Sequence, residues 1–394
     1  MCTLEERLAF FTADNQGGRI RRKLLQRMQG ARTSVDGQEV IVFASTNYLG
    51  LASHPQVVAA AHQALDEWGV GTAAGPRICG VTTLHRQLEE ELAQQLQVEA
   101  ALLFNSACMA NMGVIPCLAQ ENDYIYSDAY NHASIIDGCR LSKAATKVYQ
   151  HNDLQELEAL LHEGPDEGLK FIITDGLFSM DGDTAPLPEL LTLCRRYQAV
   201  LCMDDSHGLG VLGPNGLGTA DYYDLNGKVP VITGTLGKAL GGGNGGFVAG
   251  SKDLIDYLIR DSRTYRFTNT LPPASVAAAL TALRCLKEMP ELWWKLTHNT
   301  NYFRAGLKQL GFDSGSGDTP LVPLFTYDET LTFRIAEMLF VEGVYAQPYV
   351  WPAVPRGFGR LRFIISAAHT QVDLDQTLET LDKVGRQSGL LAGF

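Results

Sequence analysis

A single lysine, Lys238, stands in a run of small and apolar residues from Thr233 to Gly246, TGTLGKALGGGNGG. Three kinds of chemistry would place a cation there: a phosphate-binding loop, a solvated surface loop, or a lysine that acts as a covalent catalyst. An amine in an apolar, glycine-rich pocket loses its proton more readily than an amine in water, and the neutral amine forms imines with carbonyl compounds. Lys238 is therefore a candidate nucleophile.

The spacing around Lys238 does not fit a phosphate-binding P-loop. That loop reads G-x-x-x-x-G-K-[ST], whereas Ala239 follows the lysine and Ile232 stands where the first glycine belongs. Two runs, GLGVLG at 208–213 and GGGNGG at 241–246, match the glycine pattern of dinucleotide-binding folds. The sequence PNGLGTADYY after the first run is typical of turns, whereas a dinucleotide fold needs a helix there. This argues against a dinucleotide site.

A carboxylate and an imidazole follow the β-rich run at 199–205, where the sequence reads Asp-Asp-Ser-His. Functional groups collect at the carboxyl ends of parallel strands, so Asp204 and His207 could face one ligand, and Lys238 follows the next β-rich run. The alternative is a surface ion pair beside a core histidine, which is the usual role of such residues taken singly. Their joint placement beside glycine-rich backbone favours a ligand site.

A pyridoxal 5'-phosphate (PLP) site needs residues of these types. A lysine forms the imine, and a carboxylate keeps the pyridine nitrogen protonated so that the ring can take up carbanion charge. Hydroxyl groups and backbone N–H groups bind the phosphate. The residues around Lys238 match these requirements.

The elements that must position these residues are short β-rich runs alternating with amphipathic helices such as 187–198. This alternation predicts an α/β fold with a mostly parallel sheet that is covered on both faces. Leu84, Leu88, Leu92 and Leu96 repeat every four residues and predict one core stripe on a helix. The β-rich runs are 99–105, 123–128, 146–150, 170–175, 199–205, 229–235 and 246–250.

The length of 394 residues favours one large and one small domain over a single core. We expect an N-terminal segment at 1–45, a large domain at 46–288 and a small C-terminal α+β domain at 289–394. The Ala/Leu-rich stretch 274–288 is expected to form a helix that leaves the large domain.

The composition excludes several partners. Lys+Arg 32 against Asp+Glu 44 gives a net charge of −12, which argues against nucleic acid and anionic membranes. The sequence has no apolar run of roughly 18–20 residues, the length of a membrane span, and no signal-peptide core at its start. The eight cysteines form no C-x-x-C pair, so we expect reduced thiols, no metal site and a cytoplasmic location.

The motifs DDSHGLG and TGTLGKALGG closely resemble the α-oxoamine synthase family of PLP-dependent enzymes. The resemblance spans nearly the whole chain and implies the aspartate-aminotransferase fold, known as fold type I, with PLP as cofactor. Within the family, NHASIIDG, GTLGKALGG, RICG and SAAHT resemble glycine C-acetyltransferase most. Further matching motifs are TNYLGL (46–51), GPRICG (75–80), NHASIIDG (131–138), FSMDGD (178–183), FTNTLPPA (267–274) and GRLRFIISAAHT (359–370).

The resemblance implies roles for the residues around the cofactor ring. Lys238 would hold the cofactor and move the Cα proton of the substrate. Asp204 would pair with the pyridine nitrogen, and His207 would bind the 3′-oxygen of the ring. His132 would stack on the ring and touch the substrate, and Ser179 would support the ring oxygen or the imine.

The resemblance also implies the phosphate and substrate contacts. Thr235 and the backbone N–H groups of Ala107 and Cys108 would bind the phosphate, although relatives usually have an aromatic residue in place of Cys108. Arg362 would hold the amino-acid carboxylate, with Arg360 as a structural neighbour on the same strand face. Thr46 stands where relatives often have Asn near that carboxylate, which leaves the amino acid open. Thr268 and Asn269 would reach the cofactor phosphate of a second subunit, so the resemblance implies a homodimer with shared active sites.

The reaction implied is the condensation of a small amino acid, with glycine expected, and an acyl-CoA. It includes the reverse case, cleavage of 2-amino-3-ketobutyrate by coenzyme A to glycine and acetyl-CoA. The alternative within the family is an 8-amino-7-oxononanoate synthase or another decarboxylating synthase. Two other classes stay open: a PLP-dependent aminotransferase or aldolase, and a silent partner subunit, against which the three residues Lys238, Asp204 and His207 argue. The acyl chain length is not determined by the sequence.

Overall fold

In the computed structural model, residues 3–6, 22–27, 30–165, 167–241 and 243–391 are described. The chain forms two compact units. One unit is Thr46–Thr297, and the other joins Met1–Ser45 with His298–Phe394. The N-terminal segment therefore belongs to the same unit as the C-terminal residues, and the second boundary falls later than the expected residue 288.

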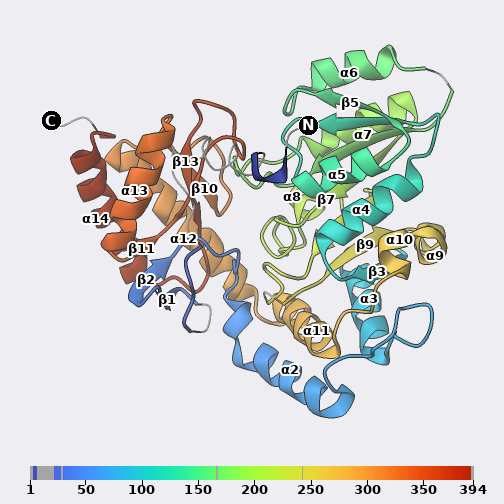
Figure 1. Ribbon diagram of the computed structural model, residues 1–394, viewed down its shortest axis with the longest axis horizontal. Helices are drawn as coiled ribbons and strands as arrows, with labels where there is room; N and C mark the ends of the chain where they lie inside the picture. Colours follow the sequence, from blue (N-terminus) through green and yellow to red (C-terminus); the bar gives the residue numbers. More distant parts are fainter. Residues whose placement is uncertain (1–2, 7–21, 28–29, 166, 242, 392–394) are drawn as a thin grey trace. The chain divides into compact units, whose positions relative to one another are not determined.

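The unit Thr46–Thr297 contains a seven-stranded sheet with strand order β3-β9-β8-β7-β6-β4-β5 (Figure 1). Each β-rich run that the sequence analysis identified overlaps one of its strands. The pairs from β5 through β4, β6 and β7 to β8 are parallel. The strands are β3 (Ala100–Phe104), β4 (Tyr124–Asp128), β5 (Ala145–Tyr149), β6 (Lys170–Asp175), β7 (Ala199–Asp204), β8 (Val231–Thr235) and β9 (Gly246–Gly250).

The sheet is mixed because β9 runs antiparallel to both of its neighbours, β8 and β3. Residues 236–245 join β8 to β9, and they are too few for the crossover of about a dozen or more residues that a parallel connection needs. The chain therefore turns back on itself directly after Lys238. The α/β fold class is confirmed, with this one strand reversed at the site.

Apolar side chains between the sheet and its helices form the core of this unit. Leu102, Ile125, Ile173 and Val248 on four strands pack in one buried cluster with Val114 on α4. Since both faces of these strands are covered, their sequences are continuously apolar rather than alternating.

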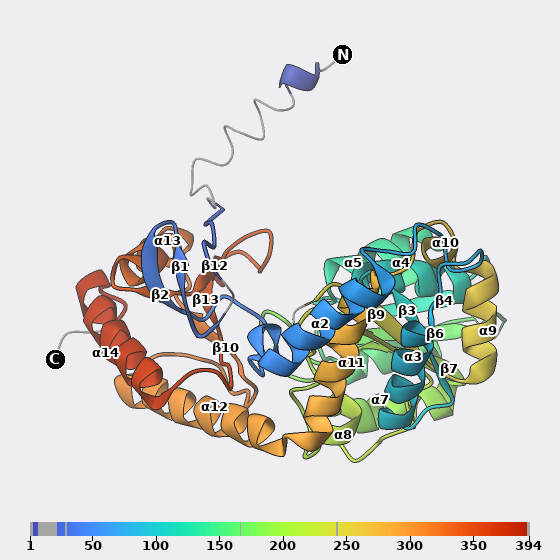
Figure 2. The same cartoon turned by 90° about the horizontal axis from the view of Figure 1, so that it is seen from below.

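Helix α11 packs against α2 and α3, and the predicted leucine stripe lies on α3. Leu88 and Leu92 on α3 are fully buried. Helices α2 and α11 lie side by side in both views (Figures 1 and 2). The helices of the unit are α2 (Pro55–Trp68), α3 (Thr83–Gln95), α4 (Ala107–Leu118), α5 (Ala133–Leu141), α6 (Leu154–His162), α7 (Leu187–Tyr197), α8 (Thr219–Tyr222), α9 (Lys252–Asp261), α10 (Arg263–Arg266) and α11 (Pro273–Glu288), with the 3-10 helix η1 (Leu51–Ser53).

Helix α11 stays in this unit, and α12 (Pro290–Leu310) carries the chain out of it, since the unit ends at Thr297. The second unit has two three-stranded sheets, β1-β2-β11 and β10-β13-β12. Its other elements are β1 (Arg32–Val35), β2 (Gln38–Val42), β10 (Leu321–Phe325), α13 (Glu329–Val341), β11 (Val344–Tyr345), β12 (Gln347–Tyr349), β13 (Arg360–Ile364) and α14 (Gln371–Ser388).

Aromatic rings join the N-terminal and C-terminal parts of this second unit. The ring of Phe43 lies 5.4 Å from those of Phe303 and Phe363 and 4.3 Å from that of His369. Arg32 on β1 also pairs with Asp373 on α14 at 2.6 Å. These contacts explain why residues before 46 fold with residues after 297.

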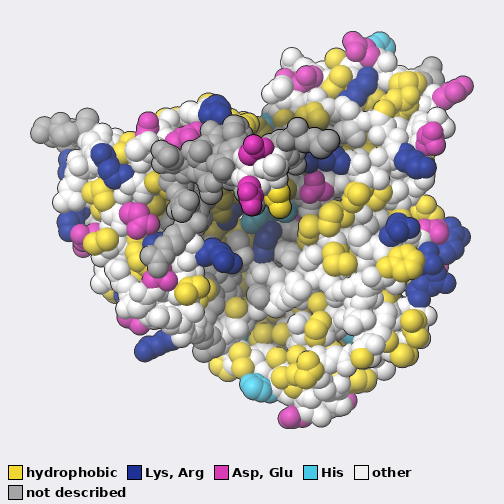
Figure 3. Space-filling view, in the orientation of Figure 1, with side chains coloured by type: hydrophobic (Ala, Val, Ile, Leu, Met, Phe, Trp, Pro, Cys, Tyr) yellow, Lys and Arg dark blue, Asp and Glu magenta, His cyan; other side chains and the backbone are white. Residues whose placement is uncertain are grey.

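The surface of the first unit carries one gathering of cations on an otherwise acidic chain. Figure 3 shows Lys and Arg side chains over α9 and α10. There Arg260 stacks on Tyr257, and Arg263 and Arg266 stack on Phe267. Among the described residues, the helices are all too short or too polar to span a membrane.

Candidate active site

Asp204 ends β7, and its buried carboxylate is held by two N–H donors. The backbone N–H of Ser206 donates to Oδ1 at 2.9 Å, and Nδ2 of Asn111 donates to Oδ2 at 2.6 Å. The side-chain oxygen of Asn111 accepts a hydrogen bond from the hydroxyl of Thr233 at 2.7 Å, which fixes the amide. Asp204 is 4% exposed. A buried carboxylate held in this way has a fixed orientation.

His207 lies three residues further on and is also buried. Its Nδ1 lies 2.7 Å from the hydroxyl of Tyr48, which comes from the start of the unit and has no exposed surface. This contact fixes the orientation of the imidazole next to the end of β7. Tyr48 therefore positions a residue that the sequence analysis identified.

His132 caps the N-terminus of α5. Its Nδ1 lies 2.8 Å from the hydroxyl of Ser134, and its backbone N–H donates to Asp175 at 2.7 Å. Desolvation lowers the pKa of His132, Lys238 lowers the pKa further, and the charge of Asp204 opposes both. The three predicted residues are thus close enough to act on one another electrostatically.

Lys238 lies half-buried in the loop between β8 and β9. The loop is closed by the N–H of Leu236, which donates to the carbonyl of Gly245 at 3.0 Å. The hydroxyl of Thr235 also donates to Gly245, at 3.1 Å, and accepts the N–H of Gly237 at 3.1 Å. The loop therefore places the lysine and a hydroxyl group on one short turn.

The same turn packs against the start of α4. A Cβ on Gly246 would lie 2.3 Å from the backbone nitrogen of Ala107, a separation that only glycine avoids. Ser106 caps the helix by accepting the N–H of Met109 at 3.1 Å. The N–H groups of Ala107 and Cys108 belong to the first turn and have no partner within the helix, and the helix dipole favours an anion there.

These groups fit PLP by their chemistry. An amine, a buried carboxylate, an oriented imidazole and a second imidazole, whose pKa desolvation lowers, lie at the carboxyl ends of β4, β7 and β8. A hydroxyl group and a helix N-terminus lie beside them and supply donors for a phosphate. Among the described residues, no cluster of His, Cys, Asp and Glu could hold a metal ion.

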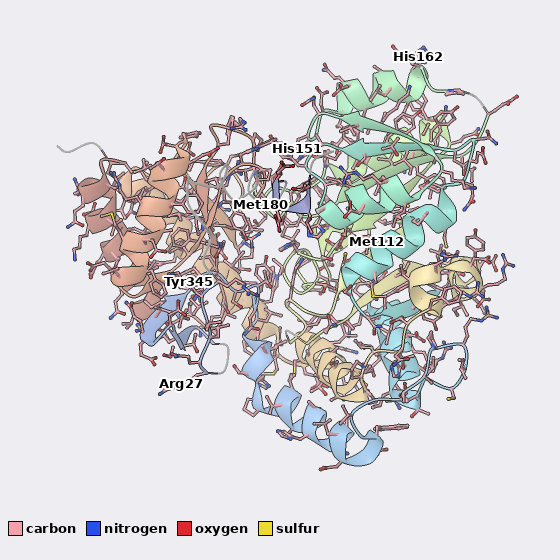
Figure 4. All side chains as sticks on the ribbon, viewed as in Figure 1. Arg27, Met112, His151, His162, Met180 and Tyr345 are labelled. Carbon is pink, nitrogen blue, oxygen red and sulfur yellow. The ribbon has the colours of Figure 1, made fainter. Side chains whose placement is uncertain are left out.

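The remaining cofactor residues of the prediction lie in neighbouring loops. Ser179 is half-buried in the loop after β6, in which Figure 4 labels Met180. The hydroxyl of Thr268 and the carbonyl of Asn269 accept hydrogen bonds from Asn105 at 3.0 and 2.8 Å. Asn269 is exposed. Their contacts with a second subunit stay a prediction.

The predicted substrate residues lie in both units. Thr46 begins the first unit, and its carbonyl accepts the N–H of Tyr48 at 2.9 Å. Arg362 lies on β13 of the second unit, with its guanidinium carbon 4.5 Å from the ring centre of Tyr349. Arg360 packs over Phe325 at 4.6 Å. The roles of Thr46 and Arg362 toward a substrate stay predictions.

Asn111 and Asp175 were missed by the sequence analysis, although each carries a signal. Asn111 is a single amide in an otherwise apolar helix, ACMANMGVIPCL. Asp175 ends β6 as Asp204 ends β7, and the two residues pair in register. Burial raises the pKa of Asp175 well above its usual range, and the charge of Asp204 raises it further. Aspartate at a strand end was therefore a signal at both positions.

Gly208, which begins the run 208–213, and Gly218 make room for the buried carboxylate of Asp205. A Cβ on Gly208 would lie 2.0 Å from Asp205 Oδ1, and a Cβ on Gly218 would lie 2.0 Å from Oδ2. Thr219 donates to this carboxylate from its N–H at 2.8 Å and from its hydroxyl at 2.6 Å. No helix begins directly after the run, which is consistent with the argument against a dinucleotide site.

Comparison with known proteins identifies the relatives of this chain. Residues 38–381 match the family model of aminotransferase class I and II. The 8-amino-7-oxononanoate synthase of Thermoanaerobacter pseudethanolicus is 46% identical over 375 residues, which cover 94% of this chain and 95% of the relative. The 8-amino-7-oxononanoate synthase 1 of Bacillus subtilis is 43% identical over 369 residues, 94% of each chain.

Solved structures give the same result. The structure of a serine palmitoyltransferase variant from S. paucimobilis with a bound PLP–myriocin aldimine superposes with a TM-score of 0.95. It is 29% identical and covers 98% of this chain and 100% of its own. An 8-amino-7-oxononanoate synthase from Francisella tularensis has a TM-score of 0.77 and 28% identity, covering 89% and 99%.

The expected special likeness to glycine C-acetyltransferase is not supported, because these curated relatives carry a different name. The motifs behind that expectation include those that hold His132, Asp204 and Lys238. These residues are predicted to contact the cofactor, which the whole family shares, so their motifs would not distinguish one pair of substrates from another. The fold, the site and the comparisons together place this chain in the aminotransferase class I and II family, among the PLP-dependent α-oxoamine synthases.

Proposed function

We propose that this chain is an 8-amino-7-oxononanoate synthase, which condenses an amino acid with an acyl thioester and releases carbon dioxide and the free thiol. The observation that carries the proposal is the 46% identity to a relative of that name, over nearly the full length of both chains. The presence of Lys238, Asp204 and His207 also supports the proposal, because a silent partner subunit would not need to keep all three residues.

The carbon skeleton of this product defines the two substrates. The ketone carbon ends a seven-carbon chain that begins with a carboxylate, so this part derives from a dicarboxylic acyl thioester. The next carbon carries the amine and a methyl group, which are the Cα and Cβ of alanine. The new C–C bond joins these two parts, the thioester C–S bond breaks, and the carboxylate of alanine leaves as carbon dioxide.

Residues at the strand ends would handle the charge at Cα. Lys238 would anchor the cofactor and move the proton at Cα. Asp204, oriented by Asn111 and Ser206, would pair with the pyridine nitrogen, and His207, held by Tyr48, would bind the ring oxygen. When bound, PLP takes up the electron pair that a leaving proton or carboxylate leaves at Cα.

The remaining cofactor contacts follow the same pattern. The imidazole of His132, whose pKa desolvation lowers, would stack on the aromatic cofactor, and Ser179 would support the ring oxygen. Thr235 and the N–H groups of Ala107 and Cys108 would bind the phosphate. These donors converge because the turn after Thr235 packs against the start of α4.

Substrate and subunit contacts complete the proposal. Arg362 would bind the amino-acid carboxylate as a bidentate clamp, and Thr46 would lie near the Cα substituent. Thr268 and Asn269 would reach the phosphate of a second subunit in a homodimer. We propose an acyl-CoA as the thioester. We also propose a cytoplasmic location.

The test offers the purified protein alanine, glycine or serine, each with a seven-carbon carboxyacyl-CoA or with acetyl-CoA. We expect thiol release with alanine and the longer thioester, together with labelled carbon dioxide from carboxyl-labelled alanine. Thiol release without carbon dioxide, or with acetyl-CoA and glycine alone, would contradict the proposal. If Thr46 lies near Cα, Thr46→Asn shifts the relative kcat/KM for the three amino acids.

A further inference from the structure

His151 lies between two carboxylates from different loops of the sheet edge. Its Nδ1 lies 3.0 Å from Asp128, at the end of β4, and its Nε2 lies 2.8 Å from Asp183, in the loop after β6. Carboxylate oxygens accept hydrogen bonds, so both ring nitrogens must donate, and only the imidazolium form carries a proton on each. While both carboxylates are ionised, the geometry therefore favours a charged histidine. Figure 4 labels His151 just past the end of β5.

Aromatic rings enclose this imidazolium. The ring of Tyr130 stacks on His151 with centres 4.4 Å apart, and the ring of Phe178 meets it edge-on, also at 4.4 Å. The His151 side chain is 17% exposed, and that of Asp128 is fully buried. Such shielding from water strengthens the attraction between the opposite charges.

The two loops that His151 joins carry predicted cofactor residues. Asp128 also accepts a hydrogen bond from the N–H of Tyr130 at 2.8 Å. Tyr130 lies in the segment 129–132, which ends at His132. The carbonyl of Asp183 accepts the N–H of Phe178 at 2.9 Å, which closes the turn that holds Ser179. The imidazolium thus connects the bases of both loops, although it belongs to neither.

We propose that His151 is a positioning residue whose charge holds segments 129–132 and 177–184 together, so that His132 and Ser179 meet the cofactor in a fixed arrangement. The inference rests on the roles proposed above for His132 and Ser179. It does not depend on which amino acid or thioester reacts.

The charge of His151 predicts a dependence on pH. Burial would lower its pKa, but hydrogen bonds and charge from Asp128 and Asp183 outweigh burial and raise the pKa to about 9. Because folding raises this pKa, the charged histidine stabilises the folded arrangement fully below the ordinary histidine pKa of about 6.5. This stabilisation is lost as the pH rises through about 9. Among the described residues, the ionisable groups in contact with the ring are Asp128, Asp183 and Tyr130.

The experiment measures PLP binding by the purified holoenzyme, dialysed against a series of PLP concentrations. We expect His151→Gln to raise the Kd for PLP at least about tenfold at neutral pH, the effect of losing one hydrogen bond between charged groups. Amide hydrogen exchange should become faster in segments 129–132 and 177–184. The matched control is His162→Gln, which removes an exposed histidine on α6 and should change neither measurement.

The pH profile separates a charged clamp from simple packing. In the wild type, the Kd for PLP should rise as pH passes through about 9, and His151→Gln should lack this step. Asp183→Asn removes one carboxylate, so the step should move to lower pH. This variant also serves as the test if His151→Gln does not fold.

Either of two results would overturn the inference: an unchanged PLP Kd in His151→Gln, or the same pH step in the wild type and in both variants. Failure of the proposed function looks different. If alanine and the seven-carbon thioester give no product while the PLP measurements follow the expectation, the substrate assignment fails and the role of His151 stands.

Discussion

At the scale of single residues, the site consists of side chains that would be costly to bury without partners. Asp204 is buried with two N–H donors, and Asn111, which supplies one of them, is itself fixed by Thr233. His207 is likewise fixed by Tyr48. Asp204 and His207 are thus each oriented by neighbours, and oriented polar groups do not have to reorganise during a reaction.

Lys238 should be the covalent anchor of the cofactor. Lys238→Ala is expected to abolish the borohydride-reducible link between protein and PLP, which mass spectrometry of the reduced protein detects. The neighbouring amine Lys252 lies exposed on α9 in an ion pair with Asp256, so Lys252→Ala is the control and should keep the link. Labelling of the Lys238→Ala variant would identify another lysine as the anchor.

Asp204→Asn should lower kcat by at least about a hundredfold, equivalent to ~2.7 kcal/mol. The reason is that the carboxylate would stabilise a protonated pyridine nitrogen most when the ring carries extra charge, and such an interaction acts on the transition state. Steady-state kinetics with PLP in excess checks this, and the bound cofactor is quantified by absorbance. A decrease of less than about tenfold would remove Asp204 from this role.

At the scale of elements, the site depends on a turn that packs against a helix start. The first residue of β9, Gly246, lies so close to the first residue of α4 that it has no room for a side chain, whereas Gly243 in the preceding turn has open space around it. The two glycines are therefore a matched pair.

Gly246→Ala should weaken PLP binding and lower the free energy of unfolding by roughly 1–3 kcal/mol, the usual effect of overpacking. Its Cβ would overlap the backbone of Ser106 and Ala107, which no side-chain rotation relieves. Gly243→Ala should leave both quantities nearly unchanged. Denaturant unfolding and PLP titration measure the two effects, and equal behaviour of the variants would show that close packing is not what positions the loop.

At the scale of the whole molecule, the proposed dimer predicts complementation between inactive variants. The first variant is Lys238→Ala, and the second replaces both Thr268 and Asn269 with alanine. In a mixed dimer, one site carries both lesions, while the other combines an intact lysine with intact phosphate contacts from the partner. Mixing should therefore restore activity.

Two controls accompany this experiment. Subunit exchange is verified with differently tagged chains, and each variant alone must be nearly inactive. If Thr268 and Asn269 serve the cofactor of their own chain, every site in the mixture carries a lesion. No recovery of activity in a verified mixed dimer would then reject the shared site.

The sequence by itself determined the strands and the residues at their ends. Continuous apolar runs define buried strands, and polar residues directly after them must lie at the sheet edge, so Asp204, His207 and the turn of Lys238 could be located without coordinates. The leucine stripe of α3 could also be predicted from the local sequence, since it depends on the helical repeat alone. The family followed from motifs, but the special likeness to glycine C-acetyltransferase did not hold.

Only the tertiary structure decided which distant residues meet. The contacts of Asn111 with Asp204, of Tyr48 with His207 and of His151 with two loops join residues far apart in the sequence, and no local pattern encodes such distances. The reversal of β9 depends on the length of one turn, and the folding of residues before 46 with residues after 297 depends on aromatic packing. Local preferences fix elements, whereas burial of polar groups with partners fixes how the elements are assembled.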